Sequence, residues 1–278
     1  MPTLPNLTDR LALNRNRARA RRAPAFFLHE EVLSEAQQRL IGVNRTFKSP
    51  AIITPFAEIW QDRWPDARIV ADDEVLALEP GAHDLVIHAL ALHWANDPVG
   101  QLVQCRRALR PDGLFLGFLF GGQTLAELRA CLAEAEAAAT GGLSPRVLPM
   151  AEIRELGALL QRAGFALPVA DSLAQSVSYR DAFHLMADLR AMGEGNALAA
   201  RLRRFSRRAV LADACARYGA TFADPDGRIN ATFEIICLTG WAAHESQQKP
   251  LRPGSAVHRL ADALAAPDFV PPKPEQDG

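Results

Sequence analysis

Polar residues that could act in chemistry follow directly after apolar runs at several points of the sequence. Asp72 and Asp73 follow one short run, and His93 and Trp94 follow the longer run 84–92. A carboxylate accepts hydrogen bonds from an amino group, and a histidine either donates or accepts one. These four residues are therefore candidates for holding a ligand or cofactor, while a helix cap or a packed aromatic residue explains the same pattern without one.

A second set of candidates follows the apolar run 114–120. Gly121 and Gly122 permit a close approach between the backbone and a ligand, and Thr124 adds a hydroxyl group. The guanidinium of Arg129 is suited to a carboxylate or to the backbone of a partner. A tight turn between a strand and a helix explains the glycines equally well, so both interpretations stay open.

Asn96 and His244 complete the candidate cleft for a substrate or partner. Asn96 precedes an Asp97–Pro98 pair that is typical of a helix start, so capping explains this loop as well. His244 and Glu245 do not form a metal motif by themselves, because a site with two histidines and one carboxylate needs a second histidine. The four cysteines are far apart, so we expect reduced thiols and no metal site.

The elements that must position these loops are typical of an α/β protein. The run 84–92 predicts a strand buried on both faces, and it is followed by a helix at 99–109 and a turn at 110–113. Together with a strand at 114–120 they form a βαβ unit, whose two strands should be parallel. Ligands of such sheets lie beyond the carboxyl ends of the strands, which is where the candidate residues stand.

The rest of the chain predicts a mostly parallel sheet flanked by helices. A helical insertion is expected at about 180–218, as two helices broken at 193–196. The other expected elements are strands at 50–54, 67–71, 173–179 and 232–238, and helices at 25–41, 56–64, 124–139 and 151–163.

Composition and charge limit the class of protein. The chain has 278 residues, of which 49% are hydrophobic, and no apolar run reaches the roughly 18 residues that a membrane-spanning helix needs. Membrane-spanning, collagen-like and wholly disordered proteins are therefore excluded. Residues 1–22 carry six arginines and Asp9, a net charge of +5, which leaves −6 for the remainder because the total is −1. We expect a solvated basic arm at 1–24 that binds no nucleic acid, a domain at 25–250 and a Pro-rich disordered tail at 251–278.

Seven blocks of sequence resemble, in the same order, the mitochondrial complex I assembly factor 5 family and its bacterial relatives. The resemblance covers residues 7–250, and FGGQTLAELR and GWAAHES are its most specific parts. The blocks are ALHWANDP (91–98), LRPDGLFLGFLFGGQTLAELR (109–129), GGLSP (141–145), LGALLQRAGF (156–165), LMADLRAMGEGN (185–196), DGRINATFEI (226–235) and GWAAHES (240–246).

The resemblance implies a class I S-adenosylmethionine-dependent methyltransferase fold, a Rossmann-like sheet whose N-terminal part is truncated here. It also implies a role in assembling NADH:ubiquinone oxidoreductase, with a peripheral subunit of that complex as the partner. By the same resemblance, Asp72 and Asp73 stand near the adenine amino group of the cofactor. A bacterial protein would then be cytoplasmic, with a peripheral place at the inner membrane as an option, and a eukaryotic one would lie in the mitochondrial matrix.

One departure from the family concerns the cofactor loop. Members of the family carry a loop of the type DLGCGRG after the first strand, where glycines let the backbone approach the methionine moiety. Here residues 50–60 read PAIITPFAEIW, and no glycine occurs between Gly42 and Gly81. Pro55 also lacks a backbone N–H group. We therefore expect a degenerate cofactor loop.

Three functions remain open from the sequence. The resemblance implies an enzyme that modifies an assembly subunit, either as a methyltransferase or, like the mitochondrial member of the family, as an arginine hydroxylase. The altered loop favours a non-catalytic, chaperone-like binding protein for a complex I subunit. A third alternative is a carrier-protein O-methyltransferase of the type used in biotin synthesis, to which the family is related.

Overall fold

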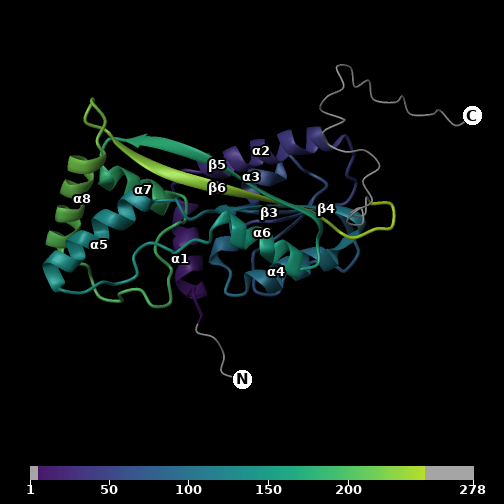
Figure 1. Cartoon of the computed structure of the whole chain (residues 1–278), viewed down its shortest axis with the longest axis horizontal. Helices are drawn as coiled ribbons and strands as arrows, with labels where there is room; N and C mark the ends of the chain where they lie inside the picture. The colour runs from purple at the N-terminus through teal and green to yellow at the C-terminus, as the bar shows by residue number, and fades with distance from the viewer. Residues whose placement is uncertain (1–5, 248–278) are drawn as a thin grey trace, which may run out of the picture. The chain divides into compact units, whose positions relative to one another are not determined.

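The computed structural model describes residues 6–247 and contains one six-stranded sheet, with the strand order β2-β1-β3-β4-β6-β5 (Figure 1). All described helices and strands belong to one compact unit, Met1–His244. The strands are β1 (Pro50–Ile53), β2 (Arg68–Val70), β3 (His83–Ala89), β4 (Leu109–Phe120), β5 (Ala166–Tyr179) and β6 (Ile229–Trp241). The α-helices are α1 (Arg10–Ala20), α2 (Phe27–Val43), α3 (Ala57–Gln61), α4 (Pro98–Ala108), α5 (Ala126–Thr140), α6 (Ile153–Arg162), α7 (Ala182–Ala191) and α8 (Arg208–Phe222), and the short 3-10 helix η1 covers Leu92–Trp94.

The predicted βαβ unit is confirmed as β3, α4 and β4. The side chain of Asp97 accepts a hydrogen bond from the backbone N–H of Gly100 at 2.8 Å and so caps α4, and β3 and β4 pair in parallel. The predicted turn at 110–113 lies inside β4 instead. The pairing shifts there, from Leu109 opposite His83 to Leu114 opposite Leu85, so the turn residues form a bulge within one longer strand.

The sheet is mixed, with three parallel and two antiparallel pairs of strands. β1 pairs in parallel with β2 and β3, whereas β6 runs antiparallel to both β4 and β5. β5 and β6 are about twice as long as the sequence predicted. Exposed and partly buried residues alternate along most of β5, and several of them are polar or small. Such a strand does not stand out as an apolar run in the sequence.

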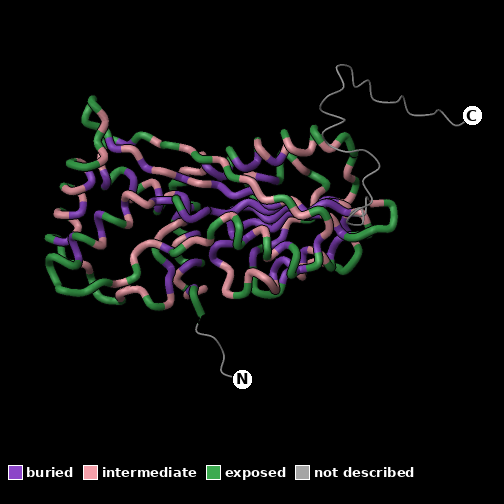
Figure 2. Tube along the Cα trace, in the orientation of Figure 1, coloured by how far each residue is buried: buried purple, intermediate pink, exposed green. Residues whose placement is uncertain are grey.

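The side chains of alternate residues in the central strands pack into two separate hydrophobic cores, one on each face of the sheet. Leu85 and Ile87 of β3 pack into the core that α2, α5, α7 and α8 cover. Val86, between them, packs into the core that α4 and α6 cover. The strands in the middle of the molecule are accordingly almost wholly buried (Figure 2).

Residues 6–24 are part of the fold, which corrects the prediction of a solvated arm at 1–24 for the described part of that range. Residues 10–20 form α1, which buries Leu13, Arg17 and Ala20. No local pattern predicts this, because α1 is rich in arginine and its docking depends on partners far away along the chain. The predicted tail at 251–278 lies outside the described residues, and the helices expected within 180–218 are α7 and α8, the second of which extends to Phe222.

Candidate functional site

The carboxyl ends of β1 to β4 meet at one edge of the sheet, and α1 lies against that edge through its contacts with Pro55 and Asp72. Arg21 donates a hydrogen bond to the carbonyl oxygen of Pro55, at the end of β1, at 2.6 Å. The backbone N–H of Thr8 donates to Oδ1 of Asn96, after β3, at 2.9 Å. The N-terminal segment therefore covers the place where a ligand of such a sheet would bind.

Asp72 binds two arginines of α1 and so holds this helix against the edge of the sheet. Nη1 of Arg17 lies 2.7 Å from Oδ1 and 2.9 Å from Oδ2 of Asp72, and Nη1 of Arg10 lies 3.1 Å from Oδ2. The Arg17–Asp72 pair is buried, with side chains 5% and 6% exposed. Asp73 is mostly exposed and lies 3.7 Å from Arg10. The carboxylate that the family resemblance places near adenine is thus engaged by two arginines of α1.

Small cavities remain on either side of the Arg10–Asp72 ion pair, which lines both of them. One, of about 180 Å³, is also lined by Arg17 and Arg21 of α1. The other, of about 300 Å³, is also lined by Asn96. Arg10 and Asp72 thus border the space that remains at this edge of the sheet.

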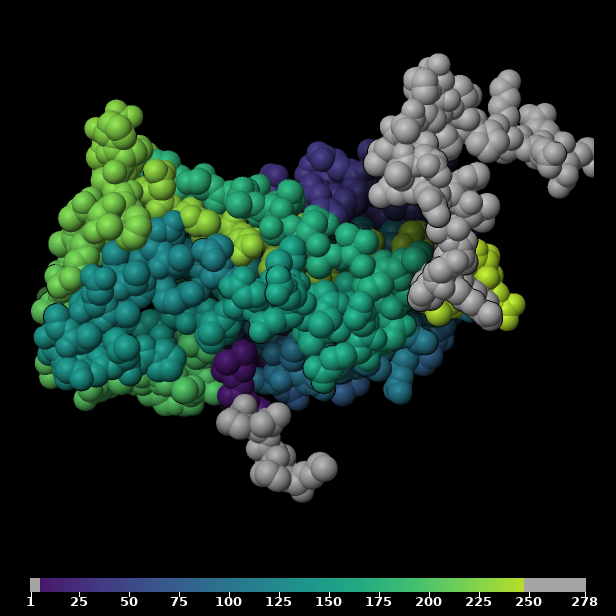
Figure 3. Space-filling view, in the orientation of Figure 1, coloured from purple at the N-terminus to yellow at the C-terminus, as the bar shows by residue number. Residues whose placement is uncertain are grey.

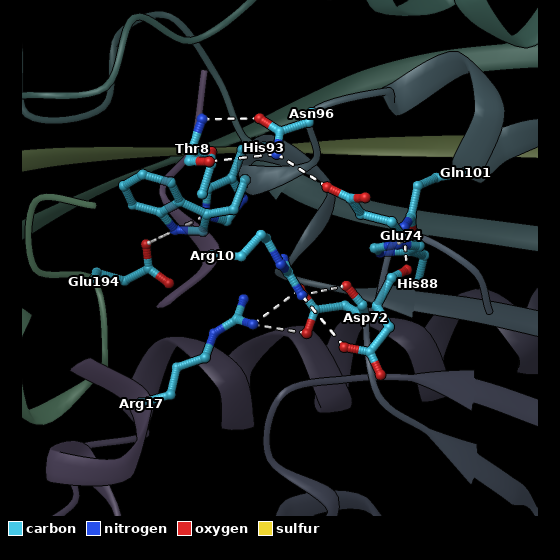
Figure 4. A network of polar contacts seen from close by, with 12 residues as sticks. Thr8, Arg10, Arg17, Asp72, Glu74, His88, His93, Asn96, Gln101 and Glu194 are labelled. Carbon is cyan, nitrogen blue, oxygen red and sulfur yellow. Dashed lines mark hydrogen bonds and ion pairs between the residues drawn. The ribbon is translucent and has the colours of Figure 1, made fainter. Parts of the chain in front are cut away.

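His93 and Trp94 meet a carboxylate that the sequence analysis did not select, that of Glu194. Nε1 of Trp94 donates to Oε2 of Glu194 at 2.7 Å, and Nε2 of His93 lies 3.2 Å from the same oxygen (Figure 4). Burial opposes the ionisation of Glu194, but electrostatic attraction and hydrogen bonds from His93 and Trp94 outweigh it and hold the pKa of Glu194 below its usual value. Oε1 of Glu194 has no hydrogen bond within residues 6–247. The only sequence signal for Glu194 was its place between two glycines at the break after α7.

A cavity of about 230 Å³ opens beside this cluster, and we call it the Trp94 cavity. Its walls are mostly apolar and come from β4, α5, α7, α8 and β6, with Phe120 and Leu128 among them, while Arg146 and Arg190 add two basic side chains. Trp94 and Glu194 contribute to its lining, as does Thr124. The structure therefore brings Trp94, a candidate for cofactor binding, and Thr124, a candidate for the cleft, to one cavity.

The glycines and Arg129 serve the turn after β4. A Cβ atom on Gly121 would lie 2.6 Å from Oε2 of Glu234, and one on Gly122 would lie 2.4 Å from Oε1 of Glu152. Arg129 donates to the carbonyl oxygens of Gly122 and Thr124 at 3.3 and 3.2 Å. The close carboxylates explain the two glycines, and the contacts with backbone carbonyl groups explain Arg129. This agrees with the tight turn that the sequence leaves open as an alternative to a ligand site.

The structure does not bring His244 to this edge, so its placement in the cleft was wrong. The last residue of β6, Trp241, pairs with Leu114 near the start of β4, and the N–H of Ala242 donates to the carbonyl oxygen of Gly113. The cleft lies at the other end of β4, beyond Phe120. Because β6 is antiparallel to β4, the segment that follows β6 returns to the opposite edge of the sheet.

The loop after β1 is filled with side chains. Phe56 is fully buried, with its ring centroid 4.4 Å from that of Phe26 and 5.0 Å from that of His29. The guanidinium of Arg21 lies 5.4 Å from the centroid of the Phe56 ring, and Oγ1 of Thr54 accepts a hydrogen bond from the N–H of Phe56. The loop thus contains no glycine, and the ring of Phe56 is packed beneath it.

Neither a metal-binding cluster nor a membrane-spanning helix occurs within residues 6–247. No group of three or more His, Cys, Asp or Glu side chains there is arranged to hold a metal ion. No helix in the same range is long and apolar enough to cross a membrane.

Comparison with known proteins supports the fold and the kinship. A family model described as "Methyltransferase domain" matches residues 31–117. The "Arginine-hydroxylase NDUFAF5, mitochondrial" of Homo sapiens is 39% identical over 208 residues, which are 75% of this chain and 60% of that protein. The mouse protein of the same name is 43% identical over 206 residues, 74% of this chain and 60% of that one.

A second group of relatives is more distant. The "Malonyl-[acyl-carrier protein] O-methyltransferase" of Laribacter hongkongensis is 34% identical over 191 residues, covering 69% of this chain and 62% of that protein. The chain thus spans about 60% of the length of the curated relatives that it matches. With its mixed six-stranded sheet, flanking helices and an identity of about 40% to the NDUFAF5 proteins, the chain is a homologue of NDUFAF5 with the class I methyltransferase fold.

Proposed function

We propose that this chain assists the assembly of NADH:ubiquinone oxidoreductase by holding an arginine-bearing segment of a peripheral subunit in the Trp94 cavity. We further propose that it does so without S-adenosylmethionine held in the manner of a glycine-loop methyltransferase. The observation that carries the proposal is the loop after β1, where the buried ring of Phe56 fills the place of the glycines.

The residues at the end of β1 do not fit the cofactor. A glycine loop gives the ligand close contact with backbone N–H groups, whereas Pro55 has no N–H group and Phe56 is packed on Phe26 and His29. Asp72, which the family resemblance assigns to the adenine end, already accepts hydrogen bonds from Arg10 and Arg17. No step of the proposed function therefore involves the cofactor.

The Trp94 cavity has the chemistry that an arginine side chain requires. Its apolar walls suit the three methylene groups, and Trp94, the residue type that binds cations best through its ring, is among the lining residues. The free Oε1 of Glu194 provides a charge-assisted hydrogen bond, while His93 and Trp94 fix the orientation of the carboxylate through Oε2. The name of the NDUFAF5 relatives, arginine-hydroxylases, supports arginine as the side chain recognised.

Calorimetric titration separates the two parts of the proposal. We expect no micromolar binding of S-adenosylmethionine, and binding of an arginine-containing peptide from the partner subunit that is lost in Glu194→Gln. Glu79→Gln is the matched control, because Glu79 is exposed and far along the chain from the cavity. Micromolar binding of S-adenosylmethionine would contradict the first part and reopen methylation of a protein or a carrier protein. Equal peptide binding by Glu194→Gln and the wild type would contradict the second part.

Deletion of the gene tests the assembly role itself. We expect assembled NADH:ubiquinone oxidoreductase to fall, and to recover with the wild-type gene but not with Glu194→Gln. Unaltered assembly after deletion would refute the role. Mass spectrometry of the partner subunit distinguishes binding from hydroxylation, since one added oxygen atom on its arginine, present only with this gene, would assign hydroxylation to the chain.

A further inference from the structure

The segment that leads into α8 carries an unusual concentration of positive charge on the surface. Residues 201–208 read RLRRFSRR, with five arginines and no acidic residue, and we call them the basic loop. In the middle of these arginines, Phe205 is fully exposed to solvent. The loop thus combines an exposed aromatic ring with a dense group of cations, which is the composition of segments that bind at a membrane interface.

The N-terminal segment adds apolar side chains to the same side of the molecule. Thr8 forms a β-bridge with Leu198, and Arg201 and Arg203 lie 2.9 and 3.4 Å from Oδ2 of Asp9. Leu11, on the first turn of α1, is 71% exposed. Figure 1 shows the segment between α7 and α8 on the lower side of the view, where α1 begins, and Figure 3 shows both segments at the surface there.

Most of the charge of the basic loop is not neutralised. Asp9 is shared by Arg201 and Arg203, while Arg204, Arg207 and Arg208 form no ion pair within residues 6–247. The loop is nevertheless held in place, since Nη1 of Arg146 donates to Oγ of Ser206 at 2.9 Å. Fixed cations with an apolar ring between them would meet an anionic surface that has an apolar layer beneath it.

We propose that the basic loop, together with Leu11, binds the surface of an anionic lipid membrane, with Phe205 inserted below the headgroups. Clusters of four to eight basic residues bind anionic lipids, and Phe and Leu are the side chains that interfacial segments bury. A single-stranded nucleic acid is a poorer match, because it requires several stacked aromatic rings and gains nothing from an aliphatic side chain such as Leu11. Neither Leu11 nor any residue of the basic loop lines the Trp94 cavity, so the inference does not depend on the proposed function.

Vesicle co-sedimentation of the full chain tests this surface. We expect binding to vesicles of phosphatidylcholine mixed with phosphatidylglycerol, weakening as salt is added, and no binding to phosphatidylcholine alone. Arg204→Gln/Arg207→Gln should weaken binding about 25-fold, at about fivefold per arginine. Arg154→Gln/Arg162→Gln changes the net charge equally on exposed positions of α6 and should leave binding unchanged.

The role of the ring has its own pair of variants. Phe205→Ser should weaken vesicle binding about tenfold, because the buried ring is lost, whereas Phe183→Ser, at a half-exposed ring on α7, should not. Absence of binding to phosphatidylglycerol vesicles would overturn the proposal, as would an equal loss in the two arginine pairs or an unchanged affinity of Phe205→Ser. Tighter binding to a single-stranded oligonucleotide than to vesicles would also overturn it, in favour of a nucleic-acid surface.

Discussion

Replacing Arg17 by methionine should destabilise the protein strongly, although this arginine lies in a segment whose sequence resembles a solvated arm. Arg17 and Asp72 are each about 95% buried and their closest atoms are 2.7 Å apart. Removal of one partner from a buried ion pair leaves an uncompensated charge and costs about 3 to 5 kcal/mol. Since Arg10 remains beside Asp72, we expect the lower end, about 3 kcal/mol. For a chain of this size that lowers Tm by about 6 to 12 °C.

Urea unfolding and calorimetry of four proteins would measure this effect. In Arg17→Met/Asp72→Leu both charges are absent, so we expect most of the lost stability to return, because burying an apolar pair carries no desolvation penalty. Arg217→Met removes one partner of an exposed ion pair with Asp213 on α8, and should leave Tm almost unchanged. If Arg17→Met lost no more stability than Arg217→Met, or if the double variant were no better than the single one, the ion pair would not be what holds α1 to the sheet.

Three further predictions concern packing and pH. Gly121→Ala should lower the free energy of unfolding by about 1 to 3 kcal/mol in urea, because its Cβ would lie 2.6 Å from a carboxylate oxygen of β6; Gly42→Ala, with nothing within 4 Å, should not. Arg146 lowers the pKa of Glu136 to about 2, from 4.5 in the unfolded chain. The Glu136 carboxylate therefore contributes fully to the free energy of unfolding above pH 4.5, and this contribution is lost as the pH falls towards 2. Glu136→Gln should flatten stability over that window, and an unchanged slope would contradict this assignment. Burial lowers the pKa of His29 from 6.5 to about 4, so on acidification the unfolded chain takes up this proton before the folded chain does. The free energy of unfolding therefore decreases as the pH falls from 6.5 to 4. His29→Phe should remove that part of the pH profile.

The parts of the fold that could be predicted are those whose signals are local. β3, α4 and β4 follow from a continuous apolar run and from the capping pair Asp97–Pro98. The docking of α1 could not be predicted, because most of its side chains are polar. Its position depends on Asp72, which is 55 residues away from Arg17 in the sequence.

The candidate site shows the same division. Trp94 and Thr124 were selected because they follow strands of the parallel part of the sheet, where the βαβ rule applies. Glu194 follows a helix outside that part of the sheet, so the rule does not reach it, and only contacts across about 100 residues of sequence bring it to His93 and Trp94. His244 follows a strand too, but β6 runs antiparallel to β4, so the end of β6 lies at the opposite edge of the sheet. No local motif predicts the direction of β6 relative to β4.

The position of α1 also has a consequence for the order in which the chain folds during synthesis. Ribosomes release the N-terminus first, yet the partners of this segment come late. Arg17 requires Asp72, the N–H of Asp9 donates to the carbonyl oxygen of Ala197, and the Asp9 carboxylate pairs with Arg201. Contacts between residues far apart in sequence form slowly, because the loop between them must close first. Although α1 is synthesised before the sheet that it covers, it is therefore among the last helices to reach its final position. Until residue 201 has left the ribosome, the carboxyl edge of the sheet lacks its complete cover.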